Sequence, residues 1–160
     1  MLEKNSKQPN SRSCFLCGRG NSIGLKMSWY NDEKTQKVWS ELVVPEQFNS
    51  YPGVVHGGVV AAILDETSGR ALLLGNDDQL MVTAHLELKY RHPTPTNQPI
   101  TAVGWIIKGG KKRARVAGEI RLADGTVTAE CRATILKPPA GFFESHGWQE
   151  EKPYWKVYDD

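Results

Sequence analysis

Several features that would mark particular protein classes are scarce or absent in this sequence. Three cysteines in 160 residues are too few for the disulfide framework of a small secreted domain. No apolar run is long enough to span a membrane, and no lipidation motif or cleavable leader is present. The net charge of +2 gives no general argument for nucleic acid as a partner. These absences favour a cytoplasmic protein that works without a membrane or nucleic acid.

The length predicts one domain with flanking segments of different composition. Residues 1–13 are polar and are expected to be disordered. Residues 14–138 are expected to form the globular domain, which Pro138-Pro139 closes. Residues 139–160 form a tail with five aromatic side chains, namely Phe142, Phe143, Trp148, Tyr154 and Trp155. A tail this aromatic is expected to dock on the domain or on a second subunit.

One apolar helix is predicted within the stretch Tyr51–Gly75. Its residues are apolar nearly all round, which is typical of a helix enclosed by the rest of a fold, and Gly75-Asn76 can end it. Alternating patterns predict strands at 24–30 and 37–44 before the helix, and at 81–92, 100–108, 111–122 and 127–135 after it. This order favours an α+β fold in which an antiparallel sheet curls around a single helix.

The start of this helix carries the strongest chemical pattern. Gly57 and Gly58 fall where backbone N–H groups have no partner inside the helix, and glycine allows a ligand to approach closely. These groups could hold a carbonyl oxygen as it gains negative charge. Asp65 lies eight residues later in an apolar run, where a carboxylate needs a partner or water. Alternatively, residues 65–70 simply mark where the helix reaches the surface.

A CxxC motif, Cys14 to Cys17 followed by Gly18, precedes the first predicted strand. Zinc needs about four ligands, and the sequence has no second CxxC and no histidines at finger-like spacing. A structural turn is favoured, and no metal or cofactor is assigned; a metal site shared between subunits and a redox dithiol are the alternatives. Cys131 lies on the apolar face of the last strand and is predicted to be a core residue.

Several of these stretches together resemble the hotdog-fold acyl-CoA thioesterases, in particular the PaaI-like branch. The resemblance covers roughly residues 14–138. It rests on Tyr51–Gly58 (YPGVVHGG), Leu64-Asp65-Glu66, Arg91–Thr94, Ala123-Asp124-Gly125, and Cys14–Gly18 with Ile23-Gly24-Leu25. It implies a curved antiparallel sheet of about six strands around one long helix. It also implies a homodimer, often paired into a homotetramer, with active sites between subunits.

The resemblance further implies hydrolysis of an acyl-CoA or acyl-carrier thioester. By analogy, the Gly57 backbone N–H polarises the thioester carbonyl, and Asp65 of the other subunit acts as general base or nucleophile. His56 helps to place the carbonyl or the water, Gly58 lies beside the substrate, and Thr83 assists the carboxylate.

The sequence departs from this family at one position. Many relatives carry Asn or Gln seven residues before the oxyanion glycine, whereas this chain has Ser50 there with Asn49 beside it. Glu66 adds a second candidate carboxylate, about 100° around the helix from Asp65.

Phosphate groups of CoA would need cationic partners, and Lys108 and Arg113 are the candidates beside the Gly109-Gly110 turn. A solvated strand face is the alternative interpretation of these charges. Three rival functions remain: a non-catalytic acyl-CoA binding module, a hotdog hydratase or dehydratase, and an assembly protein whose CxxC binds metal.

Overall fold

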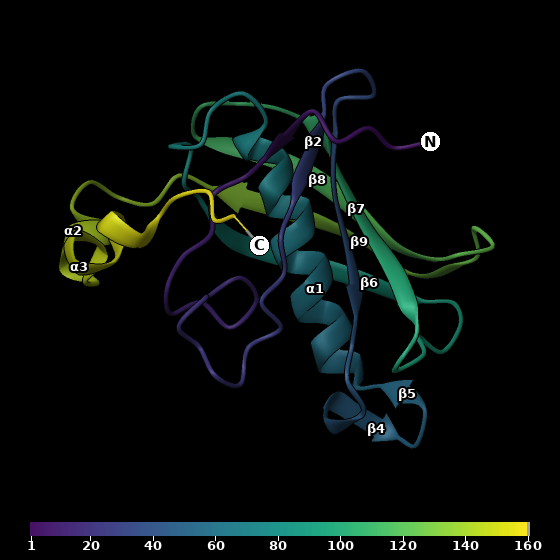
Figure 1. Ribbon diagram of the computed structural model, residues 1–160. Helices are drawn as coiled ribbons and strands as arrows, with labels where there is room; N and C mark the ends of the chain where they lie inside the picture. The colour runs from purple at the N-terminus through teal and green to yellow at the C-terminus, as the bar shows by residue number, and fades with distance from the viewer. Residues whose placement is uncertain (160) are drawn as a thin grey trace.

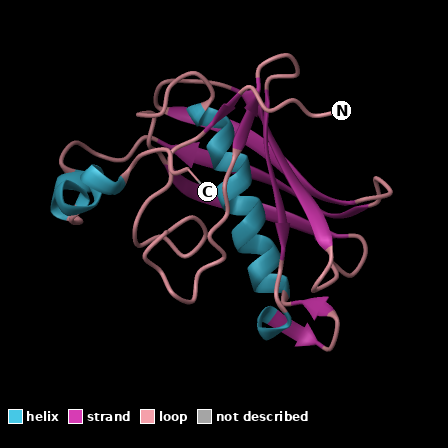
Figure 2. Cartoon of the chain, in the orientation of Figure 1, coloured by secondary structure: helices cyan, strands magenta, loops and turns pink. Residues whose placement is uncertain are grey.

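The computed structural model describes residues 1–159 and contains one large antiparallel sheet with a long helix across one face (Figures 1 and 2). The helix is α1 (Gly57–Arg70), which continues into the short 3-10 helix η2 (Ala71–Leu73). Seven strands form the sheet in the order β1 (Ser6–Lys7), β2 (Tyr30–Asp32), β3 (Lys37–Val43), β7 (Pro99–Lys108), β8 (Arg113–Leu122), β9 (Val127–Leu136) and β6 (Val82–Tyr90). The predicted α+β arrangement of one enclosed helix and an antiparallel sheet is confirmed.

Helix α1 packs closely on the sheet because two glycines face it. Gly104 on β7 pairs with Gly118 on β8. A Cβ on Gly104 would lie 2.9 Å from the carbonyl carbon of Thr67 and 3.1 Å from the Cα of Ser68, both in the helix backbone. The helix contributes buried Val60, Ile63 and Leu64 to the core. Cys131 is buried in the same core, as predicted.

A short hairpin lies at the N-terminal end of α1 (Figure 1). The predicted loop 45–53 contains a 3-10 turn, η1 (Glu46–Phe48), and strand β4 (Asn49–Tyr51), which pairs with β5 (Val54–Val55). The Glu46 carboxylate holds this hairpin, since it accepts hydrogen bonds from the Asn49 amide at 2.8 Å, the Gly53 N–H at 2.9 Å and the Thr96 hydroxyl. This fixes the chain immediately before the helix begins.

The N-terminal segment is ordered, so the prediction of disorder over 1–13 is wrong. Strand β1 pairs with β2, and Gln8 and Asn10 are fully buried. The Asn10 amide donates to the Cys17 carbonyl at 3.0 Å and to the Met27 carbonyl at 2.7 Å. Polar composition predicted disorder because it supplies little apolar surface, but here side-chain amides hold the segment by satisfying buried backbone groups.

The predicted strand at 24–30 is mostly irregular, and only its last residue enters β2. Met27 and Trp29 are buried as the alternation suggests. However, the Met27 N–H donates to the Leu16 carbonyl at 2.8 Å, in the cysteine-containing turn, and the Trp29 carbonyl accepts from the Gln8 N–H at 2.9 Å, directly after β1.

The C-terminal tail docks on its own chain, through α2 (Phe142–Ser145), α3 (Trp148–Glu151) and η3 (Lys152–Tyr154). The Glu151 carboxylate accepts from the backbone N–H groups of Arg12 and Ser13 at 2.5 and 3.0 Å. The Trp155 indole donates to the Asp77 carbonyl at 3.2 Å. The tail therefore joins the N-terminal segment to the loop that follows η2. Over residues 1–159, no helix is sufficiently long and apolar to cross a membrane.

Candidate active site

The first turn of α1 leaves one backbone donor free. His56 caps the helix: its Nδ1 accepts from the Gly58 N–H at 2.9 Å, and its carbonyl accepts from Val59 and Val60 at 2.9 and 3.1 Å. Among residues 1–159, no hydrogen bond is formed by the Gly57 N–H. This donor lies at the positive end of the helix dipole, where a developing oxyanion is stabilised. The Gly58 N–H, also predicted to bind substrate, is already used by the cap.

Asp65 is half-buried and has a defined partner. Its Oδ1 accepts from the Thr83 hydroxyl at 2.8 Å. Burial raises the pKa of the Asp65 carboxyl, the Thr83 hydrogen bond opposes that rise, and the neighbouring Glu66 charge adds to it, so that the net pKa lies above the ordinary value. A carboxylate with a raised pKa is a better proton acceptor at working pH.

A β-bulge turns Thr83 toward Asp65. Strict alternation along β6 groups Thr83 with His85 and Glu87 on the face away from the helix. The register of β6 against β9 shifts between Thr83 and His85, so the alternation breaks there. Thr83 contacts the helix while Leu86 and Leu88 still pack against the core. The face predicted for Thr83 by alternation is therefore wrong, although its place beside Asp65 is as the resemblance implied.

Gly57 lies at the start of α1, and Asp65 lies about two turns further along the helix. Asp65 follows Gly57 by eight positions, which corresponds to about 12 Å along the helix axis. Strand β6 runs beside α1 with Thr83 bonded to Asp65 and the Tyr90 hydroxyl donating to the Gly57 carbonyl at 2.7 Å. One carbonyl cannot contact both the Gly57 N–H and the Asp65 carboxylate of the same chain at that separation.

A cavity of about 450 Å³ opens beside Asp65. Its wall includes Thr83, Glu66 and the two cysteines of the CxxC motif. Apolar and aromatic side chains complete it, among them Leu72, Leu73, Leu80, Met81, Phe143, Trp148 and Trp155. The C-terminal tail therefore encloses the hollow that Asp65 faces, which sequence reasoning could not foresee because the tail contacts depend on the folded chain.

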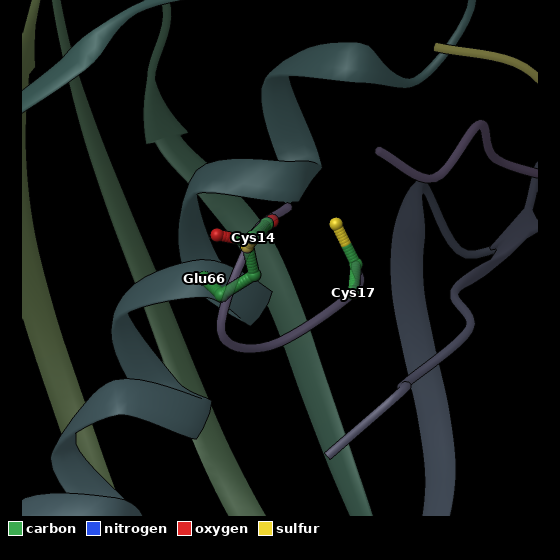
Figure 3. Close-up of side chains that lie close together, drawn as sticks. All are labelled: Cys14, Cys17 and Glu66. Carbon is green, nitrogen blue, oxygen red and sulfur yellow. The ribbon is translucent and has the colours of Figure 1, made fainter. Parts of the chain in front are cut away.

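Glu66 faces a different set of partners from Asp65. Its Oε1 accepts from the Nε of buried Arg70 at 2.8 Å. Figure 3 shows Glu66 on α1 close to Cys14 and Cys17 on the N-terminal turn. Between the two cysteines, the Cys14 thiol donates a hydrogen bond to the Cys17 sulfur. This hydrogen bond lowers the pKa of Cys17 to about 6 and raises the pKa of Cys14. Glu66 is thus paired with a cation, whereas the hydrogen-bond partner of Asp65 is the neutral Thr83 hydroxyl.

The remaining predicted site residues lie in the β4–β5 hairpin and beside the turn between β7 and β8. The Asn49 amide is bonded to Glu46, and Ser50 is exposed at an irregularity in the β4–β5 hairpin. Lys108 and Arg113 are exposed and do not line the cavity. In register, Arg113 pairs with Leu136, one residue from cavity-lining Ile135, so the basic turn lies at the cavity end of the sheet.

Comparisons with known proteins identify the family of the chain. Residues 52–129 match the family model described as the thioesterase superfamily. A predicted esterase of Saccharolobus solfataricus is 32% identical over 106 residues, a match that covers 66% of this chain and 74% of that protein. The chain belongs to the thioesterase superfamily. Human acyl-coenzyme A thioesterase 13 is 28% identical over 99 residues, which cover 61% of this chain and 71% of that protein.

Solved structures of this superfamily share the hotdog fold predicted for the chain. A thioesterase superfamily protein aligns with a TM-score of 0.71 at 28% identity, covering 78% of this chain and 63% of that one. The Escherichia coli PaaI protein aligns with a TM-score of 0.63 at 17% identity, over 72% of this chain and 81% of its own. A Streptococcus mutans protein bound to acetyl CoA aligns with a TM-score of 0.61 at 18% identity, over 69% of this chain and 86% of that protein. The last two comparisons concern the fold alone.

Proposed function

We propose that this thioesterase superfamily member hydrolyses an acyl-CoA or acyl-carrier thioester to a free acid and a thiol. The observation that carries the proposal is Asp65, a half-buried carboxylate with a raised pKa, held by Thr83 and facing a cavity. The free Gly57 N–H supplies the complementary oxyanion donor. Similarity to human acyl-coenzyme A thioesterase 13 supports CoA thioesters as the substrate class.

In the proposed reaction, Asp65 takes a proton from water as the water oxygen attacks the thioester carbonyl carbon. The carbonyl oxygen becomes negative and accepts from the Gly57 N–H. The tetrahedral intermediate then collapses, the carbon–sulfur bond breaks, and the thiolate leaves and takes up a proton. The products are a carboxylic acid and a thiol. Direct attack by the Asp65 carboxylate, followed by hydrolysis of the anhydride, is the covalent version of the same assignment.

A homodimer would complete the site. Strand β6 is nine residues long, mostly exposed, and pairs only with β9 among the described strands, so its other edge can accept a strand. Antiparallel pairing of two β6 strands about a two-fold axis would bring the Thr83 end of one beside the Tyr90 end of the other. Because Asp65 accompanies Thr83 and Gly57 accompanies Tyr90, each Asp65 would then face its partner's Gly57. Two such dimers could pair into a homotetramer.

The other candidates receive lesser roles in this proposal. His56 fixes the helix start and with it the direction of the Gly57 N–H. Lys108 and Arg113 are proposed to bind the phosphates of CoA, because their exposed turn lies at the cavity end of the sheet.

A non-catalytic acyl-CoA binding module is the second candidate function. It is favoured by the hairpin, where the Asn49 amide is bonded to Glu46 and the Ser50 side chain is exposed. Neither group is oriented by a described hydrogen bond toward a water beside Asp65. Such a module would bind CoA thioesters without releasing thiol.

The test is thiol release from a panel of acyl- and aryl-CoA thioesters, with wild type and Asp65→Asn in parallel. We expect turnover of one substrate class and a loss of about 100-fold or more in kcat/KM for Asp65→Asn. Asp124→Asn, in the exposed β8–β9 turn, is the matched control and should retain wild-type activity. If wild type binds CoA by calorimetry but releases no thiol, the binding module replaces the hydrolase.

A further inference from the structure

The CxxC turn and helix α1 bring three metal-binding side chains together. One ligand atom each from Cys14, Cys17 and Glu66 lies within 4.8 Å of the others (Figure 3). The sequence offered only two of these ligands close together, because Glu66 follows Cys17 by 49 positions. We propose that Cys14, Cys17 and Glu66 bind one zinc ion, with water from the cavity as the fourth ligand.

The turn that carries the cysteines is held in a fixed shape. The Gly18 N–H donates to the Cys14 carbonyl at 2.8 Å, and the Leu16 N–H donates to the Cys14 sulfur at 3.3 Å. A Cβ on Gly18 would lie 2.6 Å from the Cys14 nitrogen, so only glycine fits there. The Ser11 hydroxyl lies 3.4 Å from the Cys17 sulfur. Hydrogen bonds of this kind orient metal-binding sulfurs before the ion arrives.

Glu66 is also held in place. Its Oε1 accepts from the Nε of Arg70, whose Nη1 donates to the Pro9 carbonyl at 2.6 Å. The Arg70 guanidinium stacks between the rings of Trp29 and Trp155, at 4.4 and 5.2 Å from their centroids. A carboxylate has more acceptor sites than the single hydrogen bond to Arg70 occupies, so Glu66 can still bind an ion.

The ligand set identifies zinc. Two thiolates and a carboxylate provide sulfur and oxygen ligands of the kind that tetrahedral Zn²⁺ accepts, whereas Ca²⁺ and Mg²⁺ prefer oxygen alone. The three ligands carry three negative charges, which one divalent ion and the Arg70 guanidinium balance. All three residues also line the cavity, so water can reach the fourth position. Zinc here would tie the N-terminal turn to the helix beside Asp65.

Metal uptake by the reduced, full-length protein tests the proposal. We expect about one zinc per chain by elemental analysis, and competition with a chromophoric chelator for Zn²⁺. Cobalt(II) substituted for zinc should give the near-ultraviolet thiolate charge-transfer band and the visible bands of a tetrahedral site. This spectrum needs no variant, so it is informative even if a variant folds poorly.

Three variants check the assignment of ligands. Cys17→Ala and Glu66→Gln should each weaken zinc binding by about tenfold or more, with circular dichroism confirming that they fold. Cys131→Ala removes a buried thiol that is not one of the three proposed ligands and should keep full zinc content. The proposal is overturned if reduced wild type takes up neither zinc nor cobalt, or if Cys131→Ala loses as much zinc as Cys17→Ala. Because the readout is metal content, the result does not depend on thioester hydrolysis.

Discussion

At the scale of single residues, Asp65 is subject to two opposing influences. Burial disfavours its charged form and raises its pKa, whereas the Thr83 hydroxyl hydrogen-bonds to the charged form and lowers it. Burial is the stronger of the two, so the net shift is upward. The carboxylate must be ionised to act as a base or nucleophile, so its pKa sets the lower pH limit of the proposed activity.

Thr83→Val tests this balance, because it preserves the shape of the side chain and removes the hydroxyl. Loss of the hydrogen bond should raise the pKa of Asp65 further. The acid limb of the pH profile of kcat/KM should therefore move to higher pH, with a loss of activity of up to about tenfold on the acid side and less at high pH. Thr101→Val, on β7, is a matched control and should not change the pH of the acid limb. A limb that stays fixed or moves to lower pH in Thr83→Val would contradict the assignment.

Part of the site could be predicted from sequence because it depends on local geometry. Gly57 and Asp65 lie on one helix, so their spacing follows from the helix itself. The orientation of Thr83 depends instead on a bulge between β6 and β9, which alternation cannot detect. The Asn49 amide is likewise bonded to Glu46, a contact that follows from the folded hairpin.

At the scale of elements, the position of α1 depends on the glycine pair beneath it. Gly104→Ala would place a methyl group against the backbone of Thr67 and Ser68, which cannot move without shifting the helix. We expect a loss of about 2–4 kcal/mol in the free energy of unfolding, measured by denaturant titration.

The control is Gly69→Ala within α1, where an added Cβ meets no atom within 4 Å. A helical alanine there should be neutral or stabilise by up to about 1 kcal/mol. Equal stability of Gly104→Ala and wild type would mean that the helix is not packed closely against β7.

Elements with strong periodicity could be predicted, and those held by side-chain hydrogen bonds could not. The central helix is a long apolar run, and the four strands that follow it are alternating or continuously apolar segments bounded by turn residues, so the sequence is sufficient to locate them. Residues 1–13 have no such pattern, and buried Gln8 and Asn10 hold them to the domain. The segment before Tyr30 alternates but bonds to the cysteine turn, which only the folded chain reveals.

At the scale of the whole molecule, the proposed dimer requires that Gly57 and Asp65 from different chains act together. Gly57→Pro can remove the oxyanion donor without breaking the helix. Proline is favoured at the first helical position, and His56 already lies near the polyproline II region that residues before proline adopt, with φ −56° and ψ 134°. Gly57→Ala keeps the N–H, and its Cβ would lie 3.5 Å from the Tyr90 hydroxyl, an ordinary contact. We expect Gly57→Pro to lose about 100-fold in kcat and Gly57→Ala much less.

Mixing two inactive variants then tests how the site is assembled. In a dimer of one Asp65→Asn chain and one Gly57→Pro chain, one site combines an intact Gly57 with the partner's intact Asp65, and the other site has neither. Random co-assembly of equal amounts makes half of the dimers mixed, each with one working site, so activity should return to about 25% of wild type. Co-refolded mixtures should reach this level, whereas each variant refolded alone should stay inactive. If Gly57 of one chain and Asp65 of its partner form one site, mixed dimers must regain activity. Mixtures that are no more active than the two single variants would therefore contradict a site shared between subunits.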